Sequence, residues 1–138
     1  MIKKLIPLIL LPSVYAVNLD RCFDIASVRY QIPNKLLKAI AITETKMNPY
    51  VIGKNGNKTY DIGLMQINSS WLPKLGRVGI KEQDLFDPCK NIQIGAWILS
   101  DNIKRYGFNL RAIGAYNAVS KDKQMVYAQK VMRNIQKQ

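Results

Sequence analysis

Histidine is absent from the 138-residue sequence, and cysteine occurs only twice. Without histidine, a Ser-His-Asp triad, a Cys-His pair and the common zinc sites cannot form. Two cysteines also cannot supply a four-thiolate metal site, so we expect no metal ion and no cofactor. Glutamate is scarce as well, since Glu44 and Glu82 are the only two. A reaction that moves a proton near neutral pH therefore depends on a carboxyl group, a tyrosine, a lysine or a cysteine.

Long apolar runs are missing too, and the N-terminus carries only a short one. Lys3 and Lys4 precede the apolar stretch Leu5–Leu11, which is too short to span a bilayer. Val14-Tyr15-Ala16 then offers small residues at the two positions that a signal peptidase recognises. This pattern is typical of a secretory signal peptide, so we predict export, cleavage after Ala16 and one domain over residues 17–138. The alternative is a buried first helix, which two prolines would interrupt.

Acidic residues are few, with 9 Asp and Glu against 21 Lys and Arg and a formal net charge of +12. The basic residues are scattered along the chain and form no dense run, which argues against a nucleic-acid partner. An exported protein of this charge would instead be attracted to an anionic cell-wall polymer. We expect no nucleic-acid partner and no stable membrane span, and we expect a monomer.

The two cysteines are Cys22 and Cys89. In an oxidising compartment, an even pair in a small domain is most simply a disulfide. The chain-entropy model assigns a closure of this length about 4 kcal/mol. The alternative is two free buried thiols, which labelling of the unreduced protein with iodoacetamide would reveal.

Most of the remaining sequence has helical periodicity. Apolar residues recur at intervals of three and four and predict helices over residues 18–30, 33–45, 87–106 and 110–117 and from 120 onward. The third helix is the clearest, because Asp87 and Pro88 form a typical start and Gly107 a typical end. In the last helix we predict one apolar face, formed by Met125, Ala128, Met132 and Ile135.

Turn signals interrupt the helical pattern between residues 47 and 70. Asn48-Pro49, Gly53 and Asn55-Gly56, with short apolar runs on either side, predict a small irregular sheet or hairpin. We therefore predict a mainly α fold of the α+β kind, a helical domain with a small β region inserted after the second helix.

Glu44 is the most informative residue of the second predicted helix. It lies four positions after Ile40 and three after Ala41, on the stripe that faces the core. Burial disfavours the charged form, so a carboxyl group there can keep its proton near neutral pH and act as a general acid. In the alternative, Glu44 lies in a frayed last turn and pairs with Lys46. Helix spacing alone does not decide between the two.

A second polar cluster follows the turn-rich stretch, over residues 60–71. An acid, an amide pair and two aromatic residues are interleaved there with apolar residues. Amides and carboxylates bind the hydroxyl and N-acetyl groups of sugars, and aromatic faces cover the apolar sides of sugar rings. A strand with a wet polar face is the alternative to a sugar cleft, and the pair Tyr116-Asn117 presents the same choice.

The order of several short motifs resembles that of the soluble, family 1 lytic transglycosylases. These motifs are Glu44, Asn48-Pro49, Gly63-Leu64-Met65-Gln66 and Ala115-Tyr116-Asn117-Ala118. The run from Asp61 to Trp71, together with Asp87-Pro88-Cys89 and Gly95-Ala96-Trp97, is similar to the small secreted members that accompany type III secretion systems, conjugation machinery and pili. The similarity extends from about Leu19 to Tyr127 and implies a lysozyme-like fold.

The segment that begins at Glu44 also resembles c-type lysozyme, in which a second carboxylate stands just before a Gly-aliphatic-aliphatic-Gln-Ile-Asn run. Asp61 holds that place here. Two residues depart from the transglycosylase pattern, because Thr45 replaces the usual Ser and Val119 replaces a frequent Gly. Threonine keeps the hydroxyl, whereas a β-branched valine cannot adopt every backbone conformation that is open to glycine.

The resemblance implies cleavage of the β-1,4 bond between N-acetylmuramic acid and N-acetylglucosamine in peptidoglycan. Glu44 would act first as the general acid and then as the base, and Asp61 would stabilise positive charge on the sugar ring. The alternative for Asp61 is an acid that caps a turn. The expected substrate contacts are Thr45, Tyr60, Gln66, Asn68, Tyr116 and Asn117.

The same resemblance implies the surroundings in which the protein works. The implied partners are peptidoglycan glycan strands and components of a secretion, conjugation or pilus apparatus, and the implied location is the periplasm. Two alternatives stay open at this point. One is a hydrolytic muramidase that uses both carboxyl groups, and the other is a non-catalytic wall-binding assembly factor.

Overall fold

The computed structural model describes residues 19–138. The predicted signal peptide, residues 1–16, lies outside these residues, so export and cleavage after Ala16 stay predictions. A first helix covers residues 19–30. The other elements follow in the order α2 (Asn34–Thr45), β1 (Ile52–Lys54), β2 (Tyr60–Ile62), β3 (Ile67–Asn68), the 3₁₀ helix η2 (Ser69–Trp71), α3 (Leu72–Gly76), the 3₁₀ helix η3 (Glu82–Phe86), α4 (Pro88–Tyr106), α5 (Leu110–Gly114) and α6 (Lys121–Gln136).

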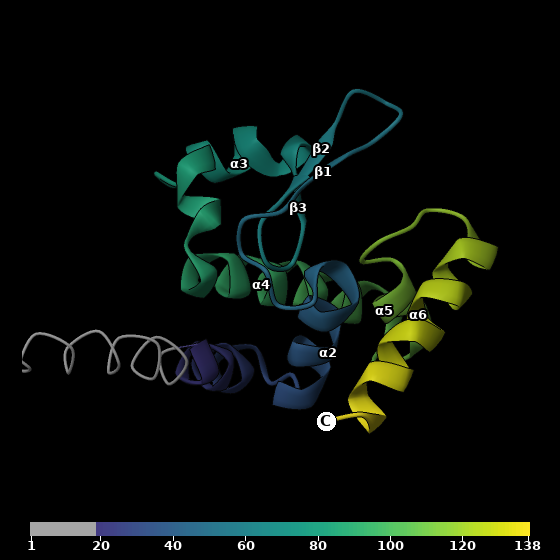
Figure 1. Cartoon of the computed structure of the whole chain (residues 1–138). Helices are drawn as coiled ribbons and strands as arrows, with labels where there is room; N and C mark the ends of the chain where they lie inside the picture. Colours follow the sequence, from purple (N-terminus) through teal and green to yellow (C-terminus); the bar gives the residue numbers. More distant parts are fainter. Residues whose placement is uncertain (1–18) are drawn as a thin grey trace, which may run out of the picture.

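Figure 1 shows α2, α4, α5 and α6 in one part of the molecule, and the sheet and α3 above them. The sheet is antiparallel, with the strand order β1-β2-β3. Its central strand pairs Asp61 with Gly53 of β1 and with Asn68 of β3. The predicted fold class is therefore confirmed: the protein is mainly α and lysozyme-like, with a small β region after the second helix.

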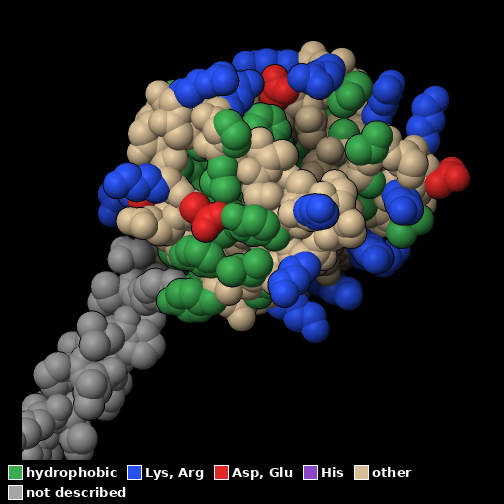
Figure 2. All heavy atoms as spheres, turned by 90° about the horizontal axis from the view of Figure 1, so that it is seen from above, with side chains coloured by type: hydrophobic (Ala, Val, Ile, Leu, Met, Phe, Trp, Pro, Cys, Tyr) green, Lys and Arg blue, Asp and Glu red, His purple; other side chains and the backbone are tan. Residues whose placement is uncertain are grey.

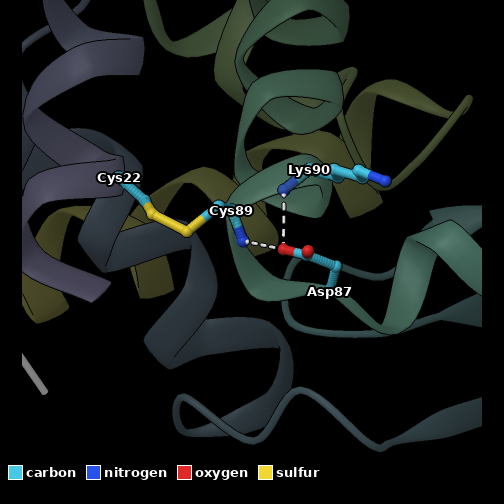
Figure 3. Close-up of a disulfide and its surroundings, with 4 residues drawn as sticks. All are labelled: Cys22, Asp87, Cys89 and Lys90. Atoms are coloured by element: carbon cyan, nitrogen blue, oxygen red, sulfur yellow. Dashed lines mark hydrogen bonds between the residues drawn. A yellow bond between two sulfur atoms is a disulfide. The ribbon is translucent and has the colours of Figure 1, made fainter. Parts of the chain in front are cut away.

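Helix α4 has the ends that the sequence predicts. Asp87 caps it by accepting hydrogen bonds from the backbone N–H groups of Cys89 and Lys90, at 2.9 and 3.2 Å (Figure 3). Pro88 is the first helical residue, and Gly107 ends the helix with a φ of 87°. These residues satisfy the N–H groups that a helix leaves free at its start and provide the backbone conformation that stops it.

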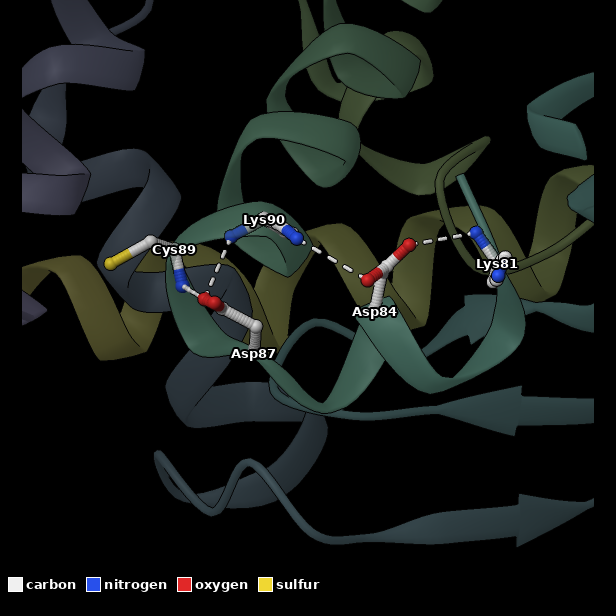
Figure 4. Close-up of polar contacts among 5 residues, drawn as sticks. All are labelled: Lys81, Asp84, Asp87, Cys89 and Lys90. Atoms are coloured by element: carbon white, nitrogen blue, oxygen red, sulfur yellow. Dashed lines mark hydrogen bonds and ion pairs between the residues drawn. The ribbon is translucent and has the colours of Figure 1, made fainter. Parts of the chain in front are cut away.

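The 3₁₀ helix η3 leads directly into α4. Asp84 accepts a hydrogen bond from the backbone N–H of Lys81 at 2.8 Å and pairs with the Lys90 ammonium group at 3.2 Å (Figure 4). These two donors hold the pKa of Asp84 below its ordinary value. Apolar periodicity does not reveal η3 or α3, because each has five residues, fewer than two turns of an α-helix.

The predicted disulfide between Cys22 and Cys89 is present (Figure 3). It joins the helix over residues 19–30 to the first turn of α4, and the two Cα atoms lie 5.1 Å apart. No cysteine within residues 19–138 is free. The alternative of two free thiols is therefore wrong.

Helix α4 also separates two hydrophobic cores. Ile92, Ala96 and Leu99 face the first core, which is built mainly by the helices. Ile94 and Ile98 face the second, which lies beneath the sheet, α3 and η3. Because both sets of side chains are buried, α4 fixes the position of the β region relative to the helical part.

The predicted apolar face of α6 is wrong in part. The structure buries Tyr127, Ala128 and Val131, whereas Met125 and Met132 are 44% and 40% exposed. The helix is turned so that the Tyr127 hydroxyl group reaches a carboxyl group on α2. Burial of Tyr127 and Val131 therefore takes the place that the periodicity alone assigns to the two methionines.

Helix α5 is shorter than predicted, since it ends at Gly114 and leaves Tyr116 and Asn117 in the turn that follows. The backbone N–H groups of Tyr116 and Asn117 bond to the carbonyl groups of Ile113 and Gly114, three residues earlier rather than four. This tighter spacing is how a chain leaves an α-helix. The consequence is that the Tyr116-Asn117 pair is presented by a turn and not by a helix face.

The surface carries its charge in scattered positions. Figure 2 shows Lys and Arg side chains at many separate places on one face, with few Asp and Glu side chains among them. Within residues 19–138, no helix has the length and apolar character needed to cross a membrane. In the same part of the chain, no three His, Cys, Asp or Glu side chains gather in a way that could hold a metal ion.

Candidate active site

Glu44 lies one residue before the end of α2. The helix stays regular up to Thr45 and ends because Lys46 and Met47 adopt left-handed backbone conformations, with φ of 53° and 68°. The backbone N–H groups of these two residues bond back to carbonyl groups of the last turn. Glu44 is therefore held in a closed helical turn and not in a frayed one.

Side chains and loops outside α2 fix this helix end. Thr45 Oγ1 donates a hydrogen bond to the carbonyl oxygen of Leu64 at 2.7 Å, and a further bond joins Thr43 to α6. Tyr127 of α6 donates its hydroxyl proton to Glu44 Oε2 at 2.6 Å. The Glu44 carboxyl group is thus held by α6, and the helix end that carries it is held by the loop after β2.

A polar cleft of about 510 Å³ opens beside Glu44. It collects side chains from α2, the sheet, η2 and the turn after α5, and its volume is in the range typical of ligand sites. Of the residues predicted for the site, the cleft is lined by Glu44, Asp61, Gln66, Asn68, Tyr116 and Asn117. Further lining comes from Asn55, Asn57, Thr59, Ser70, Trp71, Val119 and four small or aliphatic residues.

Thr45 and Tyr60 do not line the cleft. The Thr45 hydroxyl group donates to the loop after β2 and accepts a hydrogen bond from the backbone N–H of Asn48, in the turn after α2, at 3.2 Å. Tyr60 packs against the second core and donates its hydroxyl proton to the Glu82 carboxylate. Of the aromatic residues near the sheet, it is Trp71 that faces the cleft.

Asp61 stands on the central strand and is surrounded by amide donors. Asn68 donates to Asp61 Oδ1 at 2.8 Å, and Asn55 donates to Asp61 Oδ2 at 3.2 Å. Asn68 belongs to the neighbouring strand and lies directly opposite Asp61 in the register. Each carboxyl oxygen thus has a donor, which is how a carboxylate is satisfied at the edge of solvent.

The environment of Glu44 is drier and raises its pKa from 4.5 to about 7. Burial is the largest cause, since it removes water from the charged form, and the negative charge of Asp61 adds to it. Hydrogen bonds from Tyr127 and Asn117 act in the opposite direction, because they stabilise the carboxylate. A carboxyl group with this pKa can give up a proton and take one back near neutral pH.

Gln66 reaches the cleft through an unusual backbone conformation, with a φ of 56°. Its amide nitrogen donates to the carbonyl oxygens of Val51 and Gly63, each at 3.1 Å. Gly53 makes this possible, because a Cβ atom on Gly53 would lie 2.6 Å from Gln66 Oε1. The side chain therefore braces the sheet and forms part of the cleft wall at the same time.

Tyr116 is held by the loop after β2. Its hydroxyl group donates to the carbonyl oxygen of Met65 at 2.7 Å. Gly95 of α4 leaves room for this contact, since a Cβ atom there would lie 3.0 Å from the Tyr116 hydroxyl oxygen. Burial, together with the charges of Glu44 and Asp61, raises the pKa of Tyr116 well above its ordinary value, so this group is a neutral donor.

Val119, one of the two departures from the transglycosylase pattern, lines the cleft. Its side chain is 97% exposed, and its backbone φ is not in the left-handed region. The carbonyl oxygen accepts a hydrogen bond from the Gln124 amide at 3.1 Å. The conformation at this position is therefore one that valine adopts without strain.

Sequence reasoning misses Tyr127, the residue that contacts Glu44 directly. The two residues are 83 positions apart, so no local pattern connects them. Burial and the charge of Glu44 raise the pKa of Tyr127 well above its ordinary value. Tyr127 is thus a neutral hydrogen-bond donor to the carboxyl group at any pH near neutrality.

Asn91 is a second residue that the sequence analysis does not single out. Its side chain is fully buried and makes three hydrogen bonds, to the backbone of Ile62, Met65 and Leu85, at 2.8 to 2.9 Å. The same amide packs where a Cβ atom on Gly63 would lie, at 2.5 Å. A polar residue within the apolar stripe of α4 is the signal that could have revealed it.

Comparisons with known proteins agree with the fold and the cleft. The transglycosylase SLT domain family matches residues 21–138. Invasion protein IagB of Salmonella typhi is 43% identical over an alignment of 121 residues, and the alignment covers 84% of this chain and 76% of that protein. Protein IpgF of Shigella sonnei is 37% identical, over 81% of this chain and 77% of its own length. A peptidoglycan-binding-like protein of Escherichia coli O157:H7 is 39% identical, over 80% and 73%.

The fold places the chain in the lysozyme-like class of proteins. Because the family match covers most of the chain, and because relatives above 30% identity are covered over more than two thirds of their length, the family is established. The protein belongs to the transglycosylase SLT domain family.

Proposed function

We propose that the protein is a lytic transglycosylase that cleaves the β-1,4 bond between N-acetylmuramic acid and N-acetylglucosamine in peptidoglycan. The observation that carries this proposal is the setting of Glu44. It is a carboxyl group with a pKa of about 7 in a polar cleft, in a chain of the transglycosylase SLT family. The amides and the Trp71 ring around it are suited to N-acetyl sugars.

In the proposed reaction, protonated Glu44 gives its proton to the oxygen of the leaving sugar while the bond from that oxygen to C1 breaks. Positive charge then develops on the ring that keeps C1. The C6 hydroxyl group of the same ring attacks C1, and its proton passes to the Glu44 carboxylate. The product has a 1,6-anhydro end, and Glu44 regains its proton without water being consumed.

Asp61 is proposed to act as a carboxylate that stabilises the positive ring across the cleft. Support comes from its position in the same cleft as Glu44 and from the effect of its charge on the Glu44 pKa. Gln66, Asn68, Tyr116 and Asn117 are the proposed sugar contacts. The proposal no longer assigns Thr45 and Tyr60 to the substrate, since their hydroxyl groups are engaged outside the cleft.

A hydrolytic muramidase is the second candidate, and the presence of Asp61 favours it. In that reaction water would attack in place of the C6 hydroxyl group. Two cell-level features also belong to the proposal: an exported protein that works in the periplasm, and local opening of the wall for a secretion or conjugation apparatus. The name of the Salmonella relative, invasion protein IagB, supports a role at such an apparatus.

Product analysis tests this function. Purified sacculi would be digested with the protein, and the new sugar ends would be identified by mass spectrometry. Transglycosylase activity should give anhydro ends, and each of these ends is lighter by one water than a reducing end. Reducing ends alone would show that the protein is a muramidase. If a peptidoglycan zymogram showed no cleared zone, the remaining candidate would be a non-catalytic wall-binding factor.

A further inference from the structure

A second hollow lies outside the cleft and has the opposite character. It measures about 410 Å³ and is enclosed by the helix over residues 19–30, the segment from α3 to η3, and α4. A smaller hollow of about 300 Å³ shares Ile80, Gln93 and Ile94 with it, and the two adjoining hollows together are called here the apolar groove. Its floor is formed by Tyr30, Leu75, Val78, Ile80, Ile94 and Trp97.

The charged residues at the apolar groove are all basic. Arg29, Lys74 and Lys90 line it, and no Asp or Glu of the described residues does. Lys90 is already paired with Asp84. Arg29 and Lys74 make no ion pair within residues 19–138 and lie over aromatic rings instead, with Lys74 Nζ 5.6 Å from the centre of the Trp97 ring. Two exposed cations thus border an apolar floor.

Gln93 leaves a polar atom without a partner in the wall of the apolar groove. Its Oε1 atom is buried and accepts no hydrogen bond, and it is the one such side-chain atom among the described residues. A buried acceptor in a native protein almost always has a donor. An N–H group brought by an occupant would satisfy this oxygen once the Gln93 side chain turned its amide toward the groove.

We propose that the apolar groove is a docking site for an acidic amphipathic segment of a partner protein. Apolar side chains of that segment would cover the floor at Val78 and Ile94, and its carboxylates would pair with Arg29 and Lys74. On binding, Gln93 would turn its amide oxygen toward an N–H group of the segment. The inference goes beyond the proposed function, because the groove shares no residue with the cleft.

Other occupants fit the charges and the shape less well. A glycan needs amides and carboxylates around it, and the floor of the apolar groove offers aliphatic and aromatic side chains instead. A second copy of the chain would bring 21 Lys and Arg but only 9 Asp and Glu to a groove that is itself basic. Charge repulsion therefore opposes self-association through this surface.

The Trp97 side chain connects the apolar groove with the cleft. Its ring packs edge to face on Trp71, with 5.3 Å between the ring centres, and Trp71 lines the cleft. The sequence contains only these two tryptophans. An occupant that contacts Trp97 is therefore expected to change the intrinsic tryptophan fluorescence, and the signal comes from this one junction.

The experiment is a selection of 16-residue peptides from a random display library on the immobilised full chain. Peptides that also bind the Val78→Asp variant are removed. Val78 is 73% exposed, so this change leaves the fold intact, and circular dichroism checks it. We expect peptides rich in Asp and Glu beside aliphatic residues, and a change in tryptophan fluorescence on binding.

Matched variants then locate the binding of the selected peptides. Lys74→Glu and Val78→Asp should each weaken binding about tenfold or more, and binding should weaken as salt rises. Lys35→Glu and Met132→Asp place the same changes elsewhere on the surface and should leave affinity within about twofold.

Three outcomes would overturn the proposal. The first is failure to recover any peptide whose binding depends on Val78 and Lys74. The second is groove-dependent binding to phosphatidylglycerol vesicles but not to peptides, which would assign the surface to a membrane. The third is self-association in sedimentation experiments that Val78→Asp abolishes, which would assign it to a second copy. None of these results depends on peptidoglycan cleavage.

Discussion

Each of the two walls of the cleft carries one carboxyl group, and the surroundings of the two groups differ. On the helical wall, Glu44 is half-buried at the end of α2 and accepts a hydrogen bond from the Tyr127 hydroxyl group. On the sheet wall, Asp61 accepts hydrogen bonds from the side-chain amides of Asn55 and Asn68 at the edge of solvent. The comparison teaches that the proton affinity of Glu44 comes from its surroundings, since burial outweighs the hydrogen bonds that favour the charged form.

Substitution of the acid on the helical wall should have the largest effect. Glu44→Gln keeps the size of the side chain but has no proton to transfer, so we expect peptidoglycan cleavage to fall about 10³-fold. The matched control is Glu82→Gln, which changes the one other glutamate, outside the cleft, and should leave the rate nearly unchanged. Turbidity of a sacculus suspension measures both. Full activity in Glu44→Gln would remove Glu44 from the mechanism.

The side chain of Asn91 joins α4 to the β region that carries the sheet wall. Asn91→Ala removes three hydrogen bonds and leaves one backbone group each of β2, the loop after β2 and η3 buried without this partner, so we expect a loss of about 3 kcal/mol in the free energy of unfolding. Asn102→Ala, also on α4, removes a single bond and should cost about 1 kcal/mol or less. Urea denaturation followed by circular dichroism compares them. Equal losses of unfolding free energy in the two variants would contradict the role of Asn91 in joining α4 to the β region.

Removal of the charge on the sheet wall should have a smaller effect on rate and a distinct effect on pH dependence. Asp61→Asn is expected to lower cleavage about 10²-fold, because stabilisation of the positive ring is lost. It should also lower the pKa of Glu44, since the Asp61 charge raises it. Activity needs protonated Glu44, so the loss of activity at high pH should then begin at lower pH. Asp101→Asn, in an ion pair on α4, is the control.

Removal of the Tyr127 hydroxyl group, which donates a hydrogen bond to Glu44, should have the smallest effect of the four changes. Tyr127→Phe removes a donor that stabilises the carboxylate, so the pKa of Glu44 should rise and the high-pH loss of activity should begin at higher pH. We expect the rate to fall about tenfold, because the direction of the carboxyl group is less well fixed. Tyr50→Phe, at a residue that is 72% exposed, is the control. A shift in the same direction as Asp61→Asn would contradict the comparison.

Local signals were enough to predict much of this structure. Asp87, Pro88 and Gly107 act within a few residues of the helix ends they define, so α4 could be placed from the sequence. The stripe that ends at Glu44 follows from helical spacing in the same way. The β region was predicted from turn residues, whose conformational preferences are also local.

What the sequence could not give depends on contacts between distant segments. The orientation of α6 is set by Tyr127, whose partner Glu44 is 83 positions away, and helical spacing alone favours the wrong face. The Thr45 hydroxyl group, which the motif assigns to the substrate, donates a hydrogen bond to the Leu64 carbonyl group in the loop after β2. No motif in the sequence predicts that contact. The apolar groove is lined by residues from three separate segments, so the sequence of no single segment predicts it.

The central claim is that Glu44 holds its proton near neutral pH, and an NMR titration of glutamate side chains tests it most directly. The chain contains two glutamates, so selective ¹³C labelling of their carboxyl groups gives two signals, and Glu44→Gln assigns them by removing one. A midpoint near pH 7 for Glu44 is the predicted result. A midpoint near the ordinary value of 4.5 would contradict the account, because Glu44 would then be ionised before a glycan arrived.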